Sequence, residues 1–128
     1  MRIESDYLDI VAQTIFDKKG FNILVLDLTG ISSMTDYFII AEGTVDRHVQ
    51  SLARAITDQL SELGKKPLHI EGEGEGNWVV IDYGDMVIHL FTPEYREKYA
   101  IEALWKEGNI VDVKIEISQS KKLKENYE

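Results

Sequence analysis

The 128-residue sequence contains no cysteine, and this absence excludes several kinds of protein. A disulfide framework, thiol catalysis and a zinc site with sulfur ligands all require cysteine. The sequence also lacks an N-terminal apolar signal core and any run near the ~20 apolar residues of a membrane span. We therefore expect a cytoplasmic protein with no membrane partner.

Basic residues are scarce relative to acidic ones. The 14 Lys and Arg against 23 Asp and Glu give a formal net charge of −9. Binding nucleic acid through its phosphates requires a basic face, so direct, sequence-specific nucleic-acid binding is not expected. A basic protein partner fits better, because opposite charges speed encounter.

Only two prolines interrupt the chain, and 44% of its residues are apolar. This composition predicts one globular domain, which we assign to residues 1–118. Residues 119–128 form a charged C-terminal tail.

Apolar spacing predicts an α/β fold with a mixed β-sheet of about five strands flanked by helices. We expect helices from Ser5 to Lys19, from Asp46 to a stop at Gly64, and from Pro93 onward, with Gly20 ending the first. The expected strands are Asn22–Leu28, Asp36–Ala41, Pro67–Ile70, the hairpin Trp78–Phe91 and a last run Ile110–Ile117. The long helix should bring Pro67–Ile70 alongside an earlier strand in parallel.

The hairpin turns at Gly84-Asp85, a pair suited to a two-residue turn. This turn pairs Trp78 with Phe91, and the side-chain period of two then separates two faces. One face is apolar and belongs to the core: Val79, Ile81, Tyr83, Met86, Ile88 and Leu90. The other is mixed: Trp78, Val80, Asp82, Val87, His89 and Phe91. A helix covers this mixed face, or a partner binds it.

Aromatic side chains continue beyond the hairpin. Thr92 and Pro93 suit the start of a helix, on which Tyr95 and Tyr99 are neighbours. We assign Tyr99 and Trp105 to packing of this helix on the sheet.

Two groups of polar residues are candidate chemical sites. Asp82 and His89 lie diagonally on the mixed face, where they either orient a general base or, as we favour, form a structural hydrogen bond. Glu71, Glu73 and Glu75 alternate with glycines, and a flexible, solvated acidic loop is favoured over a Mg²⁺ or Ca²⁺ site. The sequence shows no nucleophile elbow and no phosphate-binding loop. We expect no catalytic residue, no metal and no cofactor.

Several separated strings resemble the ribosomal silencing factor family, also called the RsfS or Iojap-like family. They are Ser32–Phe38, Gly43-Thr44, Arg47–Val49, Trp78–Asp85 and Tyr99–Trp105, within a likeness that spans Tyr7 to Val113. The resemblance implies a fold like that of nucleotidyltransferases but no enzymatic activity. It also implies docking on the fourteenth protein of the large ribosomal subunit, which blocks the small subunit and represses translation when nutrients are scarce.

Under this resemblance the partner surface falls on the hairpin. The expected contact residues are Glu71, Trp78, Asp82, Tyr83, Met86 and Phe91, with the aromatic rings as anchors and the carboxylates facing a basic partner. A homodimer of the free protein through the same face is a further expectation. The alternative is a divergent nucleotidyltransferase-like enzyme around Ser32, Ser33 and Asp36, although the sequence has no D-x-D pair for Mg²⁺.

Overall fold

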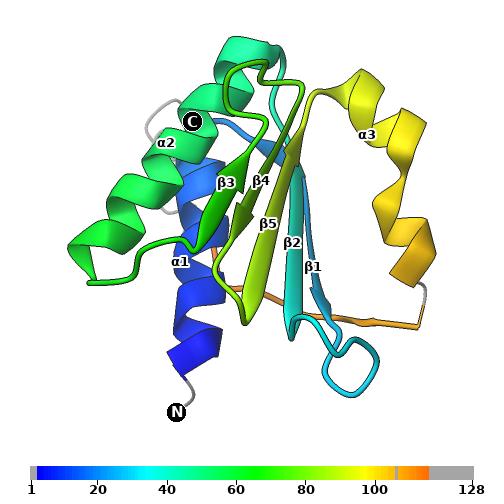
Figure 1. Cartoon of the computed structure of the whole chain (residues 1–128). Coiled ribbons are helices and arrows are strands. Elements are labelled where there is room, and N and C mark those ends of the chain that lie inside the picture. The colour runs from blue at the N-terminus through cyan, green and yellow to red at the C-terminus, as the bar shows by residue number, and fades with distance from the viewer. Residues whose placement is uncertain (1–2, 106, 116–128) are drawn as a thin grey trace, which may run out of the picture.

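The chain forms a six-stranded β-sheet with helices on both faces (Figure 1). The computed structural model describes residues 3–105 and 107–115. In chain order its elements are α1 (Ile3–Asp17), β1 (Phe21–Asp27), β2 (Tyr37–Glu42), α2 (Asp46–Glu62), β3 (His69–Glu71), β4 (Trp78–Asp82), β5 (Met86–Phe91), α3 (Pro93–Tyr99), the 3₁₀ helix η1 (Ile101–Trp105) and β6 (Asn109–Ile110). The α/β class and the mixed sheet are confirmed, with six strands in the described part where about five were expected.

The strand order is β3-β4-β5-β2-β1-β6. β2 and β5 are parallel neighbours, and the other neighbouring pairs are antiparallel. The prediction that the strand after the long helix would lie beside an earlier strand is therefore wrong, because β4 and β5 separate β3 from β2. β3 has three residues and exposed polar ends, which suit a sheet edge, while the apolar hairpin strands occupy buried positions.

The β4–β5 hairpin has the predicted register. Trp78 pairs with Phe91 and Asp82 with Val87, and the Tyr83 N–H donates to the Met86 carbonyl at 2.9 Å. Gly84 has φ 89°, a conformation that other residues adopt only with strain. The two-residue turn is thus confirmed, and it fixes which side chains share a face.

The larger core fills the space between the sheet and the pair α1 and α2, which lie together on one face (Figure 1). Its fully buried members include Leu8, Val11 and Ile15 of α1, Leu52, Ile56 and Leu60 of α2, and Val79, Ile81, Ile88 and Leu90 of the hairpin. Burial of each such side chain contributes roughly 1.5–3 kcal/mol. The apolar spacing that predicted α1 and α2 is confirmed as their buried side, except that Leu63 at the end of α2 is 49% exposed, and the inner hairpin face is confirmed.

The end of α1 differs from prediction. The helix ends at Asp17, and the left-handed residue after it is Lys19, with φ 70°, rather than Gly20. None of the helices in the described segments is long and apolar enough to cross a membrane.

The last strand is shorter than predicted. β6 pairs with β1 at Leu26 and Asp27, and the Val111 N–H still donates to the Val25 carbonyl at 2.9 Å. Beyond it, the Lys114 N–H donates to the Asp9 carboxylate at 3.0 Å. The chain therefore leaves the sheet edge toward α1 instead of continuing the strand. Residues 116–117 of the predicted strand and the predicted tail, 119–128, lie outside the described residues.

Candidate functional site

The second sheet face is partly covered by α3 and η1 (Figure 1). A smaller buried cluster lies beneath them: Leu26, Leu28, Ile40, Phe91 and Ile101. The sequence left open whether a helix or a partner covers the mixed hairpin face. In the structure the helices cover the part over β1, β2 and the end of β5, while the part over β3 and β4 remains accessible.

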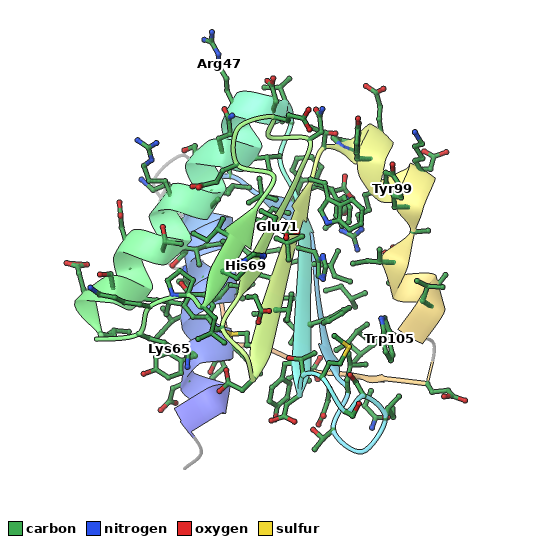
Figure 2. The ribbon with its side chains drawn as sticks, in the orientation of Figure 1. Arg47, Lys65, His69, Glu71, Tyr99 and Trp105 are labelled. Atoms are coloured by element: carbon green, nitrogen blue, oxygen red, sulfur yellow. The ribbon has the colours of Figure 1, made fainter. Side chains whose placement is uncertain are left out.

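We call this accessible part the open face. Strand pairing places His69 beside Asp82 and Glu71 beside Val80, so β3 extends the mixed face of the hairpin. The open face comprises His69, Glu71, Trp78, Val80, Asp82 and Val87, each at least partly exposed. Figure 2 shows His69 and Glu71 over the sheet, with Tyr99 of α3 to one side. Sequence reasoning missed His69, although its alternation with Glu71 was the available signal.

Trp78 lies at the boundary between the covered and open parts. Its ring stacks on Phe91 with centroids 5.0 Å apart and meets Tyr99 at 4.8 Å. Its indole N–H donates to His89 Nδ1 at 3.1 Å. Tyr99 packs as predicted and is nevertheless 43% exposed. The two rings therefore form an aromatic edge at one end of the open face.

Three of the expected contact residues are buried. Phe91 is 0% exposed, Met86 2% and Tyr83 6%. Tyr83 and Met86 face the core, where burial raises the pKa of Tyr83 to about 12, and Phe91 lies under α3. Their expected role as direct contacts is incompatible with this burial, so we assign them to support of the surface. Partner contact by Glu71, Trp78 and Asp82 stays a prediction.

In the part of the chain that the structure describes, Asp82 and His89 do not form the hydrogen bond that the sequence favoured. Asp82 instead accepts from the Gly84 N–H at 2.8 Å, while His89 Nδ1 is occupied by Trp78. His89 Nε2 is buried without a partner among the described residues. An Asp–His pair able to orient a general base is therefore not formed.

His89 is held neutral. Its ring lies 4.7 Å from Phe38, centroid to centroid, and the residue is 8% exposed. Desolvation lowers its pKa to about 4, although the negative charge of Asp82 acts in the opposite direction. The neutral imidazole can accept from Trp78 only at an unprotonated Nδ1, which places the remaining proton on Nε2.

Acidification is expected to destabilise the protein through His89. The pKa of His89 in the folded protein lies below the ordinary value of 6.5, so on acidification the unfolded chain binds a proton before the folded one does. The free energy of unfolding therefore falls as the pH drops below 6.5. Between about pH 7 and pH 5 the loss is roughly 2 kcal/mol. Urea denaturation at both pH values measures it. Over this pH range the free energy of unfolding should fall much less in His89→Gln than in wild type, and as much in His69→Gln as in wild type. Equal losses in all three proteins would contradict the assignment of the pH dependence to His89.

The acidic loop after β3 is held in place, in contrast to the flexible loop expected from its glycines. Gln50 of α2 donates to the carbonyls of Glu73 and Gly74 at 2.8 and 3.2 Å. Glu71 Oε2 lies 2.7 Å from His69 Nε2, an exposed hydrogen-bond contact on the open face. The loop carboxylates are therefore presented from a fixed backbone.

Gly72 allows the backbone of this loop to pass close to the backbone of β4. It has φ 82°, and a Cβ there would lie 2.0 Å from the Trp78 carbonyl oxygen. Gly72→Ala is expected to lower the free energy of unfolding by roughly 2–3 kcal/mol, measured by urea denaturation. Gly74→Ala is the matched control, since a Cβ there meets nothing within 4 Å. Similar losses in both variants would show that the close approach is unimportant.

The residues of the enzyme alternative have local structural roles. Ser32 Oγ accepts from the N–H groups of Met34 and Thr35 at 3.1 and 3.4 Å, closing the turn between β1 and β2. Asp36 is exposed, and its carbonyl accepts from the Leu28 N–H. Within residues 3–105 and 107–115, no group of three or more His, Asp or Glu side chains is arranged to hold a metal.

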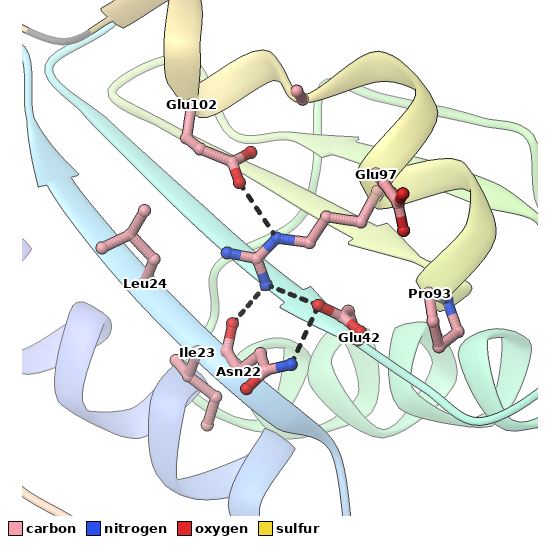
Figure 3. A pocket seen from close by; sticks show the side chains of 9 residues that line it. Asn22, Ile23, Leu24, Glu42, Pro93, Glu97 and Glu102 are labelled. Carbon is pink, nitrogen blue, oxygen red and sulfur yellow. Dashed lines mark hydrogen bonds and ion pairs between the residues drawn. The ribbon is translucent and has the colours of Figure 1, made fainter.

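Arg96 joins α3 to β1 and β2. Glu42, Glu102 and Asn22 surround its guanidinium, with dashed lines marking each interaction in Figure 3. The Arg96 nitrogens lie 3.2 Å from Glu42 and 3.4 Å from Glu102, and one donates to the Asn22 carbonyl. Asn22 has φ 52°, a left-handed conformation that asparagine tolerates. An open cavity of about 690 Å³ borders this network.

This network determines where the aromatic edge lies. Immediately after Tyr99, Ala100 adopts a left-handed conformation (φ 41°, ψ 50°) that ends α3 and redirects the chain into η1. Arg96 side-chain atoms are 13% exposed and those of Glu42 10%, so the charges are largely removed from water. Arg96 thus positions Tyr99 beside Trp78, and neither its role nor that of Glu42 was predicted.

Comparison with known proteins gives a consistent result. A family model described as "Ribosomal silencing factor during starvation" matches residues 3–128. Ribosomal silencing factor RsfS of Bacillus subtilis (strain 168) is 39% identical over 116 residues, covering 91% of this chain and 98% of that protein. A Mus musculus protein named "Mitochondrial assembly of ribosomal large subunit protein 1" is 32% identical over 101 residues, or 77% of this chain and 44% of that protein.

The fold also matches a solved structure. An X-ray crystal structure of a Chromobacterium violaceum protein superposes with a TM-score of 0.78 at 33% identity. The match covers 91% of this chain and 95% of that one. The likeness in sequence and in fold therefore extends over nearly the whole chain.

Proposed function

Because the chain belongs to the ribosomal silencing factor family, we propose that it binds the large ribosomal subunit through the subunit's fourteenth protein and prevents the small subunit from joining. The observation that carries this proposal is the open face, where Trp78, in contact with Tyr99, shares one side of β3 and β4 with the accessible residues Glu71 and Asp82. Fixed aromatic rings next to acids suit a basic protein surface. Translation is thereby repressed under nutrient limitation, in the cytoplasm.

The proposed mechanism is steric. A half-buried Trp78 can anchor the contact, since interface energy concentrates in a few large, well-packed side chains. The protein needs no cofactor and carries out no reaction; it occupies the surface that the small subunit requires. Its net charge of −9 adds repulsion of ribosomal RNA, which salt screens beyond about 8–10 Å.

Titration of this protein with the isolated fourteenth protein of the large subunit, with binding as the measurement, tests the partner assignment. We expect one-to-one binding that weakens as salt is raised, because part of the attraction is electrostatic. Binding to intact large subunits without binding to the isolated protein would contradict this partner. A homodimer of the free chain through the open face remains a prediction, tested by whether addition of the partner converts dimers to monomers.

A further inference from the structure

The segment that follows β6 stays packed against the domain. Val111, Val113 and Ile115 are half-buried, while Asp112 and Lys114 between them are exposed. Val111 and Val113 pack against the larger core cluster, on the side of the sheet that carries α1 and α2. An alternation with a period of two is that of an extended segment with one face against the domain.

This segment leads into a groove between α1 and α2. The Lys114 N–H donates to the Asp9 carboxylate at 3.0 Å, and both residues line a hollow of about 340 Å³. A second hollow of about 270 Å³ shares Thr14, Asp17 and Gln59 with the first, so the two form one groove along the helix pair. Figure 1 shows this pair on one face of the sheet and α3 on the other. The groove and the open face therefore lie on opposite sides of the sheet.

The sequence that follows Ile115 suits a groove of this kind. Ile117 is the next residue in the period-two pattern, and the run after it contains the basic cluster Lys121, Lys122 and Lys124. An apolar residue that continues a packed face, followed by three ammonium groups, matches a groove with apolar walls and carboxylates.

The groove provides both kinds of contact. Ile10 and Ala55 are half-buried in its walls, and its carboxylates belong to Asp9, Asp17 and Asp58. Lys18 and Lys114 also line it, yet none of the three carboxylates forms an ion pair with a described residue. Acidic side chains alone do not identify an occupant. Here the packed segment does so, because it brings its own continuation to the entrance of the groove.

The distances allow the basic cluster to reach the far end of the groove. Asp17 lies beyond Asp9 on α1 by about 12 Å along the helix axis. The chain from Lys114 to Lys121 spans about 10 Å as a helix and about 23 Å when extended. In either conformation the lysines can come beside Asp17 without leaving the groove.

We propose that residues 116–128 dock along this groove of the same chain, with Ile117 against its apolar wall and the basic cluster beside Asp17 and Asp58. The docked segment lies on the helical side of the sheet. Its lysines are therefore held away from the open face and do not contribute to binding of ribosomal RNA. The inference does not depend on the proposed function, because it concerns contacts within one chain.

Paramagnetic relaxation enhancement tests the docking, since a chain without cysteine takes a spin label at one introduced cysteine. Ser51→Cys places the label at an exposed position of α2, one turn before Ala55, and Lys98→Cys places it on α3 across the sheet. We expect the label at position 51 to reduce the amide signals of residues 119–124 by at least half, and the label at position 98 to leave them unchanged. Equal signals with the two labels would overturn the inference.

Exchange of charges tests the contact between the lysines and the groove. Asp17→Lys with Asp58→Lys, in the chain labelled at position 51, should restore the amide signals because the groove then repels the basic cluster. Adding Lys121→Glu with Lys122→Glu should reduce the signals again, since the opposite charges have changed places. Signals that stay reduced in the groove variant would contradict the assigned contact.

Two controls separate loss of docking from loss of folding. Asp36→Lys with Glu97→Lys makes the same change of charge at exposed positions outside the groove and should leave the signals reduced. Lys121→Glu with Lys122→Glu alone leaves α1 and α2 unaltered and should restore the signals at an unchanged melting temperature. An undiminished effect of the label in this last variant would also overturn the inference.

Two other occupants of the groove or the lysines are distinguished in the same way. When spin-labelled protein is mixed with separate isotope-labelled protein, we expect no loss of signal, and a loss equal to that within one chain would assign the groove to a second copy. Lys121→Gln with Lys122→Gln should bind purified large subunits within about twofold of wild type. A tenfold weaker affinity would assign these lysines to ribosomal RNA and overturn the inference.

Discussion

Replacement of Trp78 by alanine is expected to weaken binding to the large ribosomal subunit by about 30-fold, equivalent to ~2 kcal/mol. Trp78 is the largest ring of the open face and is held by Phe91, Tyr99 and His89. A ring fixed before binding loses little conformational freedom in the complex, so its contacts contribute more to affinity. Binding isotherms with purified large subunits measure the effect.

The same substitution also affects folding, which requires a matched control. Loss of the half-buried indole removes its packing and leaves His89 Nδ1 without a donor, at a cost of roughly 2 kcal/mol in stability. Trp105→Ala removes another half-buried indole, which packs edge-on against Phe38 from η1. This control should lose comparable stability and retain its affinity. An unchanged affinity in Trp78→Ala would exclude the open face as the anchor.

Replacement of Arg96 by methionine is expected to lower the free energy of unfolding by about 3 kcal/mol. Methionine keeps most of the buried stem but leaves Glu42 and Glu102 without their cation. A buried carboxylate without a partner is costly because water no longer solvates it. Urea denaturation measures the loss, and binding should also weaken because Tyr99 is no longer held beside Trp78.

Two further variants make this result specific. Lys98→Met changes the same charge on an exposed residue of α3 and is expected to alter stability by no more than about 0.5 kcal/mol. Adding Glu42→Gln to Arg96→Met should recover part of the loss, because the unpaired charge is then removed. Equal stability of Arg96→Met and Lys98→Met would show that the ion-pair network does not hold α3.

The hairpin and the two long helices could be predicted because their signals are local. Period two with Gly84 at the turn fixes the faces of β4 and β5, and the stripe from Val49 to Leu60 fixes the buried side of α2. The position of β3 could not be predicted, since it depends on which strands fill the sheet centre. Likeness of the fold to nucleotidyltransferases stays a prediction.

The candidate site was predicted only in part, because local patterns do not show which surfaces distant segments cover. A period-two pattern assigns side chains to faces but does not show how much of a face a later helix covers. Trp78 and Asp82 therefore remain accessible, while Phe91 of the same face is buried beneath α3. Arg96 contacts Glu42 across 54 positions of sequence, and no local pattern indicates such a pair.

Sedimentation of large subunits, small subunits and this protein together on a sucrose gradient tests the central claim most directly. We predict that the protein sediments with large subunits and that intact ribosomes fail to form, whereas they form normally without it. Intact ribosomes that assemble to the same extent while the protein remains bound would contradict the account.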